Sequence, residues 1–242
     1  MFTIKSANNQ IGGLSNTDKM PGLSYSIPVE YCNTGSTLID VEGSACFGCY
    51  ADASRYRWSN VANALENRYQ SYIKDRSGWV QAVAYILNNS KAMQNEPYFR
   101  WFDAGDIIDL QMLEDIYEVC RLTPQIKHWL PTKEFKWKKE FERKPNNLVI
   151  RVSAPFKNTP FKPGIHPTHS VVLTQAEYDR TSEITDTGIK YCPAHLQAGQ
   201  CQDCRTCWDE TECVAYRYHG KKSAGDSDRL LQIDLLDYRK AA

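Results

Sequence analysis

The spacing of the cysteines constrains this chain more than any other feature of its sequence. Three cysteines lie within seven residues near the C-terminus, and a fourth, followed by proline, precedes them; the four are Cys192, Cys201, Cys204 and Cys207. Two residues between thiolates allow a tight loop to turn both sulfurs toward one centre. Bacterial ferredoxins hold an iron–sulfur cluster with a similar close-spaced run and a remote Cys-Pro ligand. The spacing therefore predicts a metal site, and we expect a 4Fe–4S cluster.

Zinc is the alternative metal for these four thiolates. Structural zinc sites usually pair two Cys-x-x-Cys knuckles that lie a dozen or more residues apart. Three thiols within seven residues fit that pattern poorly and favour iron–sulfur over zinc. Close by, Cys213 is either a substitute ligand or a spare cysteine, and we expect His195 to be a loop residue.

A second group of cysteines lies near the N-terminus and consists of Cys32, Cys46 and Cys49. The remaining one, Cys120, lies on the apolar face of a helical pattern, and we expect it in the core. Nine cysteines are an odd number, and the first residues show no secretion signal, so a disulfide framework is disfavoured. Clustered thiols in a reducing compartment usually bind metal, so we expect a second cluster or an open site here, or one cluster whose ligands the two groups share.

Composition excludes few classes of partner. The 29 basic and 29 acidic residues balance, so net charge gives no argument for binding nucleic acid or an anionic membrane. No run approaches eighteen apolar residues, which predicts a soluble, cytoplasmic protein without a membrane partner. Residues 133–144 interleave aromatic and basic residues, a pattern that can follow a nucleic-acid backbone. Three glutamates at salt-bridge spacing favour a solvated amphipathic helix there instead.

Strand and helix patterns alternate along most of the chain. This alternation predicts βαβ units, a mostly parallel sheet, and ligand-binding groups at the C-terminal ends of the strands. We expect an α/β domain over residues 1–185 and a cysteine-rich module with a tail over residues 186–242. Residues 1–30 look irregular, and residues 230–238 fit a helix or an edge strand. The predicted strands cover residues 24–32, 98–106, 125–133, 147–153 and 169–174, and the predicted helices cover residues 51–74, 79–93, 109–121 and 134–143.

The N-terminal cysteine group resembles the end of the radical S-adenosylmethionine (SAM) signature, because Cys46-Phe-Gly-Cys49 precedes an aromatic residue and a helix. In that family three cysteines hold a 4Fe–4S cluster with one open iron, to which the methionine moiety binds. The usual first cysteine would lie four residues before Cys46, where this chain has Glu42. Cys32 is the available third thiol.

Over most of its length, the chain is similar to the bacteriophage "gene product 88"-like family, for which no reaction is established. This resemblance implies a phage origin and the cytoplasm of a host cell. The motifs that carry it are Lys-Met-Pro at residues 19–21, Cys-Phe-Gly-Cys-Tyr-Ala at 46–51, Phe-Arg-Trp-Phe-Asp-Ala-Gly-Asp at 99–106, Trp-Leu-Pro-Thr-Lys at 129–133, and the final Cys-Pro and Cys-x-x-Cys-x-x-Cys-Trp.

The radical-SAM resemblance implies an incomplete (β/α) barrel and a set of cofactor-binding residues at the strand ends. Gly105 and Asp106 would receive the amino group of the methionine. Lys133, with Arg151 or Ser153, would hold its carboxylate or the ribose. Each residue also has a structural interpretation: Asp106 as a helix cap, Lys133 as a solvated side chain, and Arg151 on the wet face of a strand.

Two functions follow from these patterns. The first is a radical-SAM-like iron–sulfur enzyme that uses one-electron reduction at an open iron, acting on a small-molecule or macromolecular substrate with an unidentified electron donor. The second is a non-catalytic protein whose iron–sulfur or zinc centre staples the C-terminal module, and which acts on a host protein or nucleic acid. An open coordination position distinguishes the enzyme from the staple.

Overall fold

The computed structural model describes residues 2–162, 164–183 and 188–219, and the predicted element at residues 230–238 lies outside this part. The described part of the chain folds around seven strands in the order β1-β2-β3-β4-β5-β7-β6, and each neighbouring pair is parallel. The α/β class and the parallel sheet are therefore confirmed. The strands are β1 (Leu23–Tyr25), β2 (Tyr98–Trp101), β3 (Lys127–Thr132), β4 (Leu148–Ser153), β5 (His169–Leu173), β6 (Ile189–Tyr191) and β7 (Cys213–Arg217).

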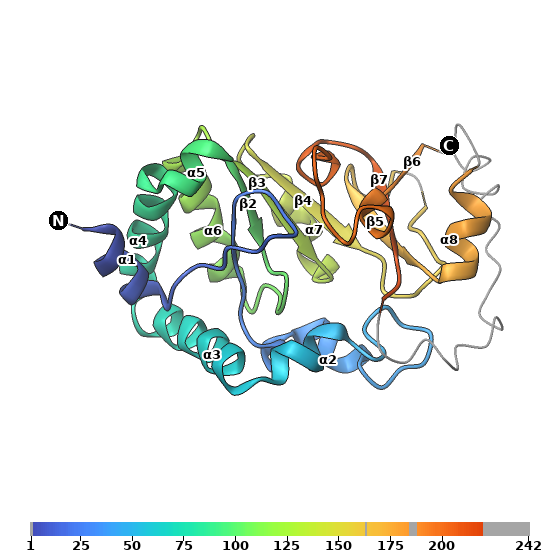
Figure 1. Cartoon of the computed structure of the whole chain (residues 1–242), viewed down its shortest axis with the longest axis horizontal. Helices are drawn as coiled ribbons and strands as arrows, with labels where there is room; N and C mark the ends of the chain where they lie inside the picture. The colour runs from blue at the N-terminus through green and yellow to red at the C-terminus, as the bar shows by residue number, and fades with distance from the viewer. Residues whose placement is uncertain (1, 163, 184–187, 220–242) are drawn as a thin grey trace.

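The sheet is open in the described part of the chain, because its edge strands β1 and β6 do not pair with each other. Helices cover the face that holds the main apolar core (Figure 1). Period-2 alternation sends Phe99 and Trp101 of β2 into this core, while Tyr98 contributes to a second cluster with Trp129 and Trp208. The helices are α1 (Ile4–Ile11), α2 (Asn33–Leu38), α3 (Ser59–Lys74), α4 (Arg76–Asn89), α5 (Lys91–Asn95), α6 (Leu110–Leu122), α7 (Lys138–Phe141) and α8 (Gln175–Thr181).

The N-terminal segment is helical, so the prediction of irregular structure over residues 1–30 was wrong for α1. Thr3 and Ser6 form a reciprocal capping box, and Gly12 ends the helix in the left-handed conformation. Ala7 and Ile11 are completely buried. The Asn-rich sequence concealed this helix because its stability comes from packing against the core and from its caps.

Two predicted helices are shorter than expected. Two 3₁₀ turns, residues 50–52 and 54–57, precede α3, which begins at Ser59. The charged segment after β3 forms a 3₁₀ turn over residues 135–137 and then the four-residue helix α7. Arg143 and Lys144 both form ion pairs with glutamates. The salt bridges expected of a solvated amphipathic helix are therefore present in part, while the helix itself is limited to α7.

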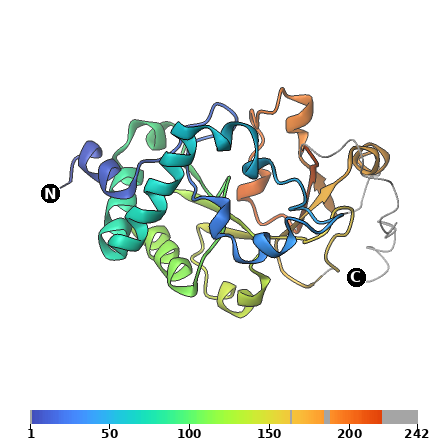
Figure 2. The ribbon, with the colours of Figure 1, turned by 90° about the horizontal axis from the view of Figure 1, so that it is seen from below.

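The cysteine-rich segment belongs to the same sheet as the rest of the chain. It connects β6 to β7, and β7 pairs along its whole length with β5. The expected domain boundary at residues 185/186 lies within 184–187, outside the described residues. Seen from below in Figure 2, α2 and α3 face the viewer, and the orange and red cysteine-rich segment lies beside the sheet.

His128 gives the fold a testable pH dependence. This β3 residue is completely buried beside Trp101 and Phe99, with Nε2 2.9 Å from Thr123 Oγ1. Burial lowers the pKa of His128 to about 3. Because the unfolded chain takes up a proton near pH 6.5 and the folded chain does not, stability falls as the pH drops below that value.

We expect His128 to remove about 2 kcal/mol of the free energy of unfolding between about pH 7.5 and about pH 5. The His128→Phe variant keeps an aromatic ring in the core and should lack this part of the pH dependence. Urea titrations of both proteins across the pH range measure the difference. Identical pH slopes in the two proteins would show that His128 does not stay neutral in the folded state.

Candidate metal centres

The C-terminal cysteines lie in a segment held by the backbone of several elements. Cys192 directly follows β6, and its N–H donates to the Ala215 carbonyl of β7 at 2.9 Å. The Cys201 N–H donates to the Lys19 carbonyl at 2.8 Å, and the Cys204 N–H closes a turn on the Cys201 carbonyl at 2.9 Å. These bonds tie Cys192 to β7 and the close-spaced run to the segment before β1.

The fold brings these four thiols into one neighbourhood. Cys192, Cys201 and Cys204 lie close enough for electrostatic interaction with one another. Cys207 interacts in the same way with Cys192 and Cys201. Within the described ranges, no group of three or more His, Cys, Asp or Glu side chains has the arrangement of a metal site. Metal ligation by these cysteines therefore stays a prediction.

Burial disfavours the charged form of these thiols. It raises the pKa of Cys207 to about 12, and it also raises the pKa values of Cys192 and Cys201. The Cys207 sulfur lies 3.1 Å from the Tyr216 hydroxyl. A metal ion must displace the protons of such thiols to bind them, so metal binding here would be linked to proton release.

Arg151 fastens the cysteine-rich segment to the sheet. Its side chain is completely buried, and it donates to the carbonyls of His169, Thr211 and Asp209 at 3.0, 2.8 and 2.9 Å. The sequence suggested a wet strand face or a cofactor carboxylate for this residue. In the structure, Arg151 belongs to β4, and its side chain reaches the backbone of the segment that carries Cys207.

Arg100 is a second guanidinium on this face of the sheet. Its Cζ lies 4.6 Å from the ring centre of Trp129, which packs with Cys207. In the described part of the chain, neither Arg100 nor Arg151 has a carboxylate within ion-pair distance, and the Nε of each is buried without a hydrogen-bond partner. The C-terminal cysteines thus face positive charge that the described carboxylates do not pair.

The N-terminal cysteines gather around Gly35 of α2. A Cβ atom at Gly35 would lie 3.6 Å from the Cys32 sulfur and 3.8 Å from the Cys46 sulfur. Cys32 also interacts electrostatically with Cys46 and Cys49. Burial raises the pKa values of Cys32 and Cys46, and the Lys133 ammonium opposes this rise at Cys46. The three thiols share one neighbourhood at the carboxyl ends of the strands.

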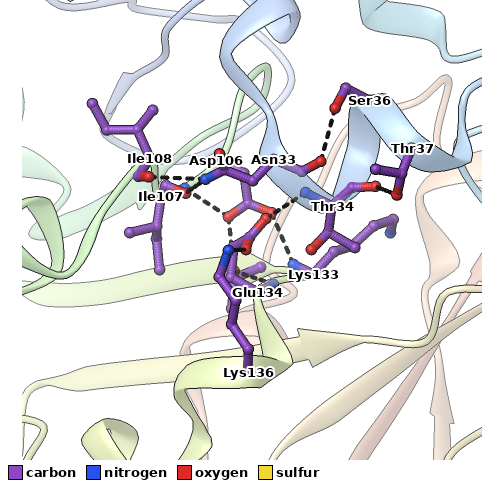
Figure 3. A network of polar contacts seen from close by, with 11 residues as sticks. Asn33, Thr34, Ser36, Thr37, Asp106, Ile107, Ile108, Lys133, Glu134 and Lys136 are labelled. Atoms are coloured by element: carbon purple, nitrogen blue, oxygen red, sulfur yellow. Dashed lines mark hydrogen bonds and ion pairs between the residues drawn. The ribbon is translucent and has the colours of Figure 1, made fainter.

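Asp106 joins the loops that follow β2 and β3 (Figure 3). Its carboxylate accepts hydrogen bonds from Thr132 Oγ1 at 2.7 Å and from the N–H groups of Lys133 and Ile107 at 2.8 Å. Burial raises the pKa of Asp106 to about 6, and these hydrogen bonds limit the rise. The residue that caps α6 is Asp109, which accepts from the Met112 N–H, so the interpretation of Asp106 as that cap was wrong.

Glu134, a residue not predicted for the site, holds α2 against the end of β3. Its side chain is completely buried, accepts from the Thr34 N–H at 2.8 Å and pairs with Lys136 at 2.9 Å (Figure 3). Glu134 lies in the segment that looked like a solvated helix. Alternating Lys and Glu residues gave no signal that one carboxylate is buried.

A family match covers most of the chain. Residues 3–210 match the family model described as gene product 88. The chain belongs to the gene product 88 family. The match spans the N-terminal group and all four C-terminal cysteines, and it confirms the expected phage family. No curated protein and no solved structure matches the chain.

The other cysteines of this gene product 88 protein lie in apolar clusters. Cys120 is completely buried in the main core, as predicted. Cys213 is completely buried in β7, packed with Val171 and Ala215. His195 packs edge-on against Tyr178, with ring centres 4.7 Å apart. Among the described helices, none is sufficiently long and apolar to span a membrane.

The remaining predicted residues follow the ends of strands. Ser153 ends β4, with its hydroxyl 3.2 Å from that of Ser170. The loop of Cys46 lies near it, because the Ala45 N–H donates to the Pro155 carbonyl at 2.8 Å. Gly105 has φ +83°, and its Cβ position lies 2.4 Å from Ile27 Cγ1 and 2.7 Å from the Ile27 carbonyl. Gly105 thus permits the close approach of the loops after β1 and β2.

We expect Gly105→Ala to destabilise the gene product 88 protein by about 3 kcal/mol, because it combines a strained φ with a steric overlap. Gly13 is the matched control, because it has φ +85° and no atom within 4 Å of its Cβ position. Gly13→Ala should cost about 1 kcal/mol from backbone strain alone. Urea unfolding measures both, and equal losses would contradict the close approach at Gly105.

Proposed function

We propose that this gene product 88 protein is an iron–sulfur protein whose C-terminal cysteines, Cys192, Cys201, Cys204 and Cys207, hold a 4Fe–4S cluster. The observation that carries the proposal is that four thiols share one neighbourhood beside two guanidiniums without described carboxylate partners. Metal-bound thiolates supply the missing negative charge, and buried N–H groups are suitable donors to their sulfurs. The close spacing of the cysteines favours an iron–sulfur cluster over zinc.

We propose a second cluster at Cys32, Cys46 and Cys49, with one iron left without a cysteine ligand. SAM is the proposed ligand of this open iron, as in radical-SAM-like enzymes. One electron, passed on by the cluster from a separate donor, would break a carbon–sulfur bond of SAM, release methionine and leave the other fragment as the radical that takes a hydrogen atom from the substrate. Gly105, Asp106, Lys133 and Ser153 at the strand ends are the proposed cofactor-binding residues. Asp106 already accepts three hydrogen bonds from the chain, so it has one acceptor position left for an amino group. The positive charge of Lys133 opposes the rise in the pKa of Cys46, so this ammonium lies near the thiol. It is suited to binding the carboxylate of SAM.

A non-catalytic, metal-stapled protein is the second candidate. The observation that favours it is the Arg151 clamp, which builds the cysteine-rich segment into the sheet. In that case zinc or an iron–sulfur cluster stabilises the fold, and the protein binds a host protein or nucleic acid. Zinc suits this role because it has no redox chemistry.

Metal analysis of protein purified without oxygen separates the two candidates. We expect a brown protein with iron and acid-labile sulfide in equal amounts, enough for two four-iron clusters. Colourless protein with stoichiometric zinc would overturn the redox proposal and support the non-catalytic protein with a structural metal site.

The same analysis tests the division of the cysteines. Cys204→Ser should lose the C-terminal cluster and loosen the segment around it, because metal binding is coupled to local folding. Cys213→Ser is the matched control, because Cys213 begins β7 directly after this segment, and this variant should keep its metal. Equal losses of iron in the two variants would refute this assignment.

SAM binding has its own spectroscopic test. Adding SAM to the reduced protein should change the electron paramagnetic resonance (EPR) signal of the N-terminal cluster, and Lys133→Met should weaken that change several-fold. Lys136→Met is the control, because Lys136 pairs with Glu134 and is not assigned to the cofactor. An EPR signal that SAM leaves unchanged in the wild type would exclude the open iron as a SAM site.

A further inference from the structure

Asp103 anchors the loop that carries Cys49. Tyr50, the next residue after Cys49, donates from its hydroxyl to the Asp103 carbonyl. Tyr56 donates to Asp103 Oδ2 at 2.8 Å, and the Ser26 hydroxyl bonds to Oδ1. Three side chains from two segments thus converge on one residue just beyond β2.

The backbone at this anchor is strained. Phe102 has φ +53°, a left-handed conformation that is rare and unfavourable for an aromatic residue. Its ring is buried and its N–H donates to the Tyr25 carbonyl at 2.7 Å, so packing and hydrogen bonding hold the conformation. Such strain concentrates at functional sites, where it fixes a neighbouring residue.

Arg100 lies between this anchor and the C-terminal cysteines. Its Nη2 is 3.4 Å from the Phe102 carbonyl, and its guanidinium stacks on Trp129, which packs with Cys207. Its positive charge interacts with Tyr50 and Asp103 on one side. On the other side, the same charge opposes the rise in the pKa of Cys201. One guanidinium therefore touches the surroundings of both cysteine groups.

We infer that Arg100 and Asp103 form a bridge that couples the two cysteine centres, with Arg100 as a positioning residue for both. This inference rests on the proposed function. Reduction of a cluster adds negative charge, which a guanidinium stabilises, and the position of that guanidinium depends on the anchor beside Cys49. A change at either centre therefore alters the other, and the coupling is reciprocal.

Redox titrations followed by EPR test the bridge, with Cys204→Ser and Cys49→Ser used to assign the signals. Arg100→Met should make the C-terminal cluster at least tenfold harder to reduce, about 59 mV for one electron, and should also change the N-terminal signal. Arg100→Lys, which keeps the charge, should restore most of the C-terminal potential.

Arg205→Met is the matched control. The positive charge of Arg205 also opposes the rise in the pKa of Cys201. Unlike Arg100, Arg205 forms an ion pair with a described carboxylate, that of Glu96, at 3.2 Å. This variant should change the C-terminal cluster alone. If Arg100→Met behaves in the same way and leaves the N-terminal signal unchanged, the bridge is refuted.

Asp103→Asn is a second, independent variant in case Arg100→Met fails to fold. Removing its negative charge should make the C-terminal cluster easier to reduce, the opposite sign from Arg100→Met, and should change the N-terminal signal. An unchanged C-terminal potential would overturn the inference. The metal content of the wild type, measured first, shows whether the proposed function fails or only the coupling does.

Discussion

The buried guanidinium of Arg151 is the interaction on which the arrangement of this protein depends. It joins β4 to the backbone carbonyls of the cysteine-rich segment, and it has no carboxylate partner among the described residues. A cation buried in this way is costly unless many acceptors surround it. Carbonyl oxygens of the segment supply them, so the segment and the sheet stabilise each other.

The parallel sheet explains why residues far apart in sequence meet at the N-terminal group. Cys32 follows β1, Asp106 follows β2 and Lys133 follows β3, and parallel strands end at one edge of the sheet. Glu134 adds α2 to this edge through its bond with the Thr34 N–H. The thiols of this group therefore lie near two carboxylates, Asp106 and Glu134, that accept hydrogen bonds from backbone N–H groups.

The connection between β6 and β7 gives the C-terminal group a different position. Cys207 lies beside Trp129 and Tyr216, and Arg100 reaches from Trp129 to the Phe102 carbonyl, next to Asp103. Two centres at these positions would share a single framework. The gene product 88 match spans both groups.

The sequence by itself determined the features that depend on local spacing. The Cys-x-x-Cys runs, the α/β class, the parallel sheet and the core position of Cys120 followed from patterns within short segments, and the structure has that class, that sheet and that core cysteine. Boundaries were less well predicted: α1 was missed because its caps and its buried face act together only in the folded chain.

Only the tertiary structure decided which charges face the cysteines. Nothing in the sequence around Arg151 or Glu134 distinguishes them from exposed charged residues, because their burial depends on segments that lie 50 to 100 positions away. Thr34 lies 100 residues from Glu134, and Asp209 lies 58 residues from Arg151. The sequence thus determined the number and spacing of the thiols, while long-range packing determined the charge that surrounds them.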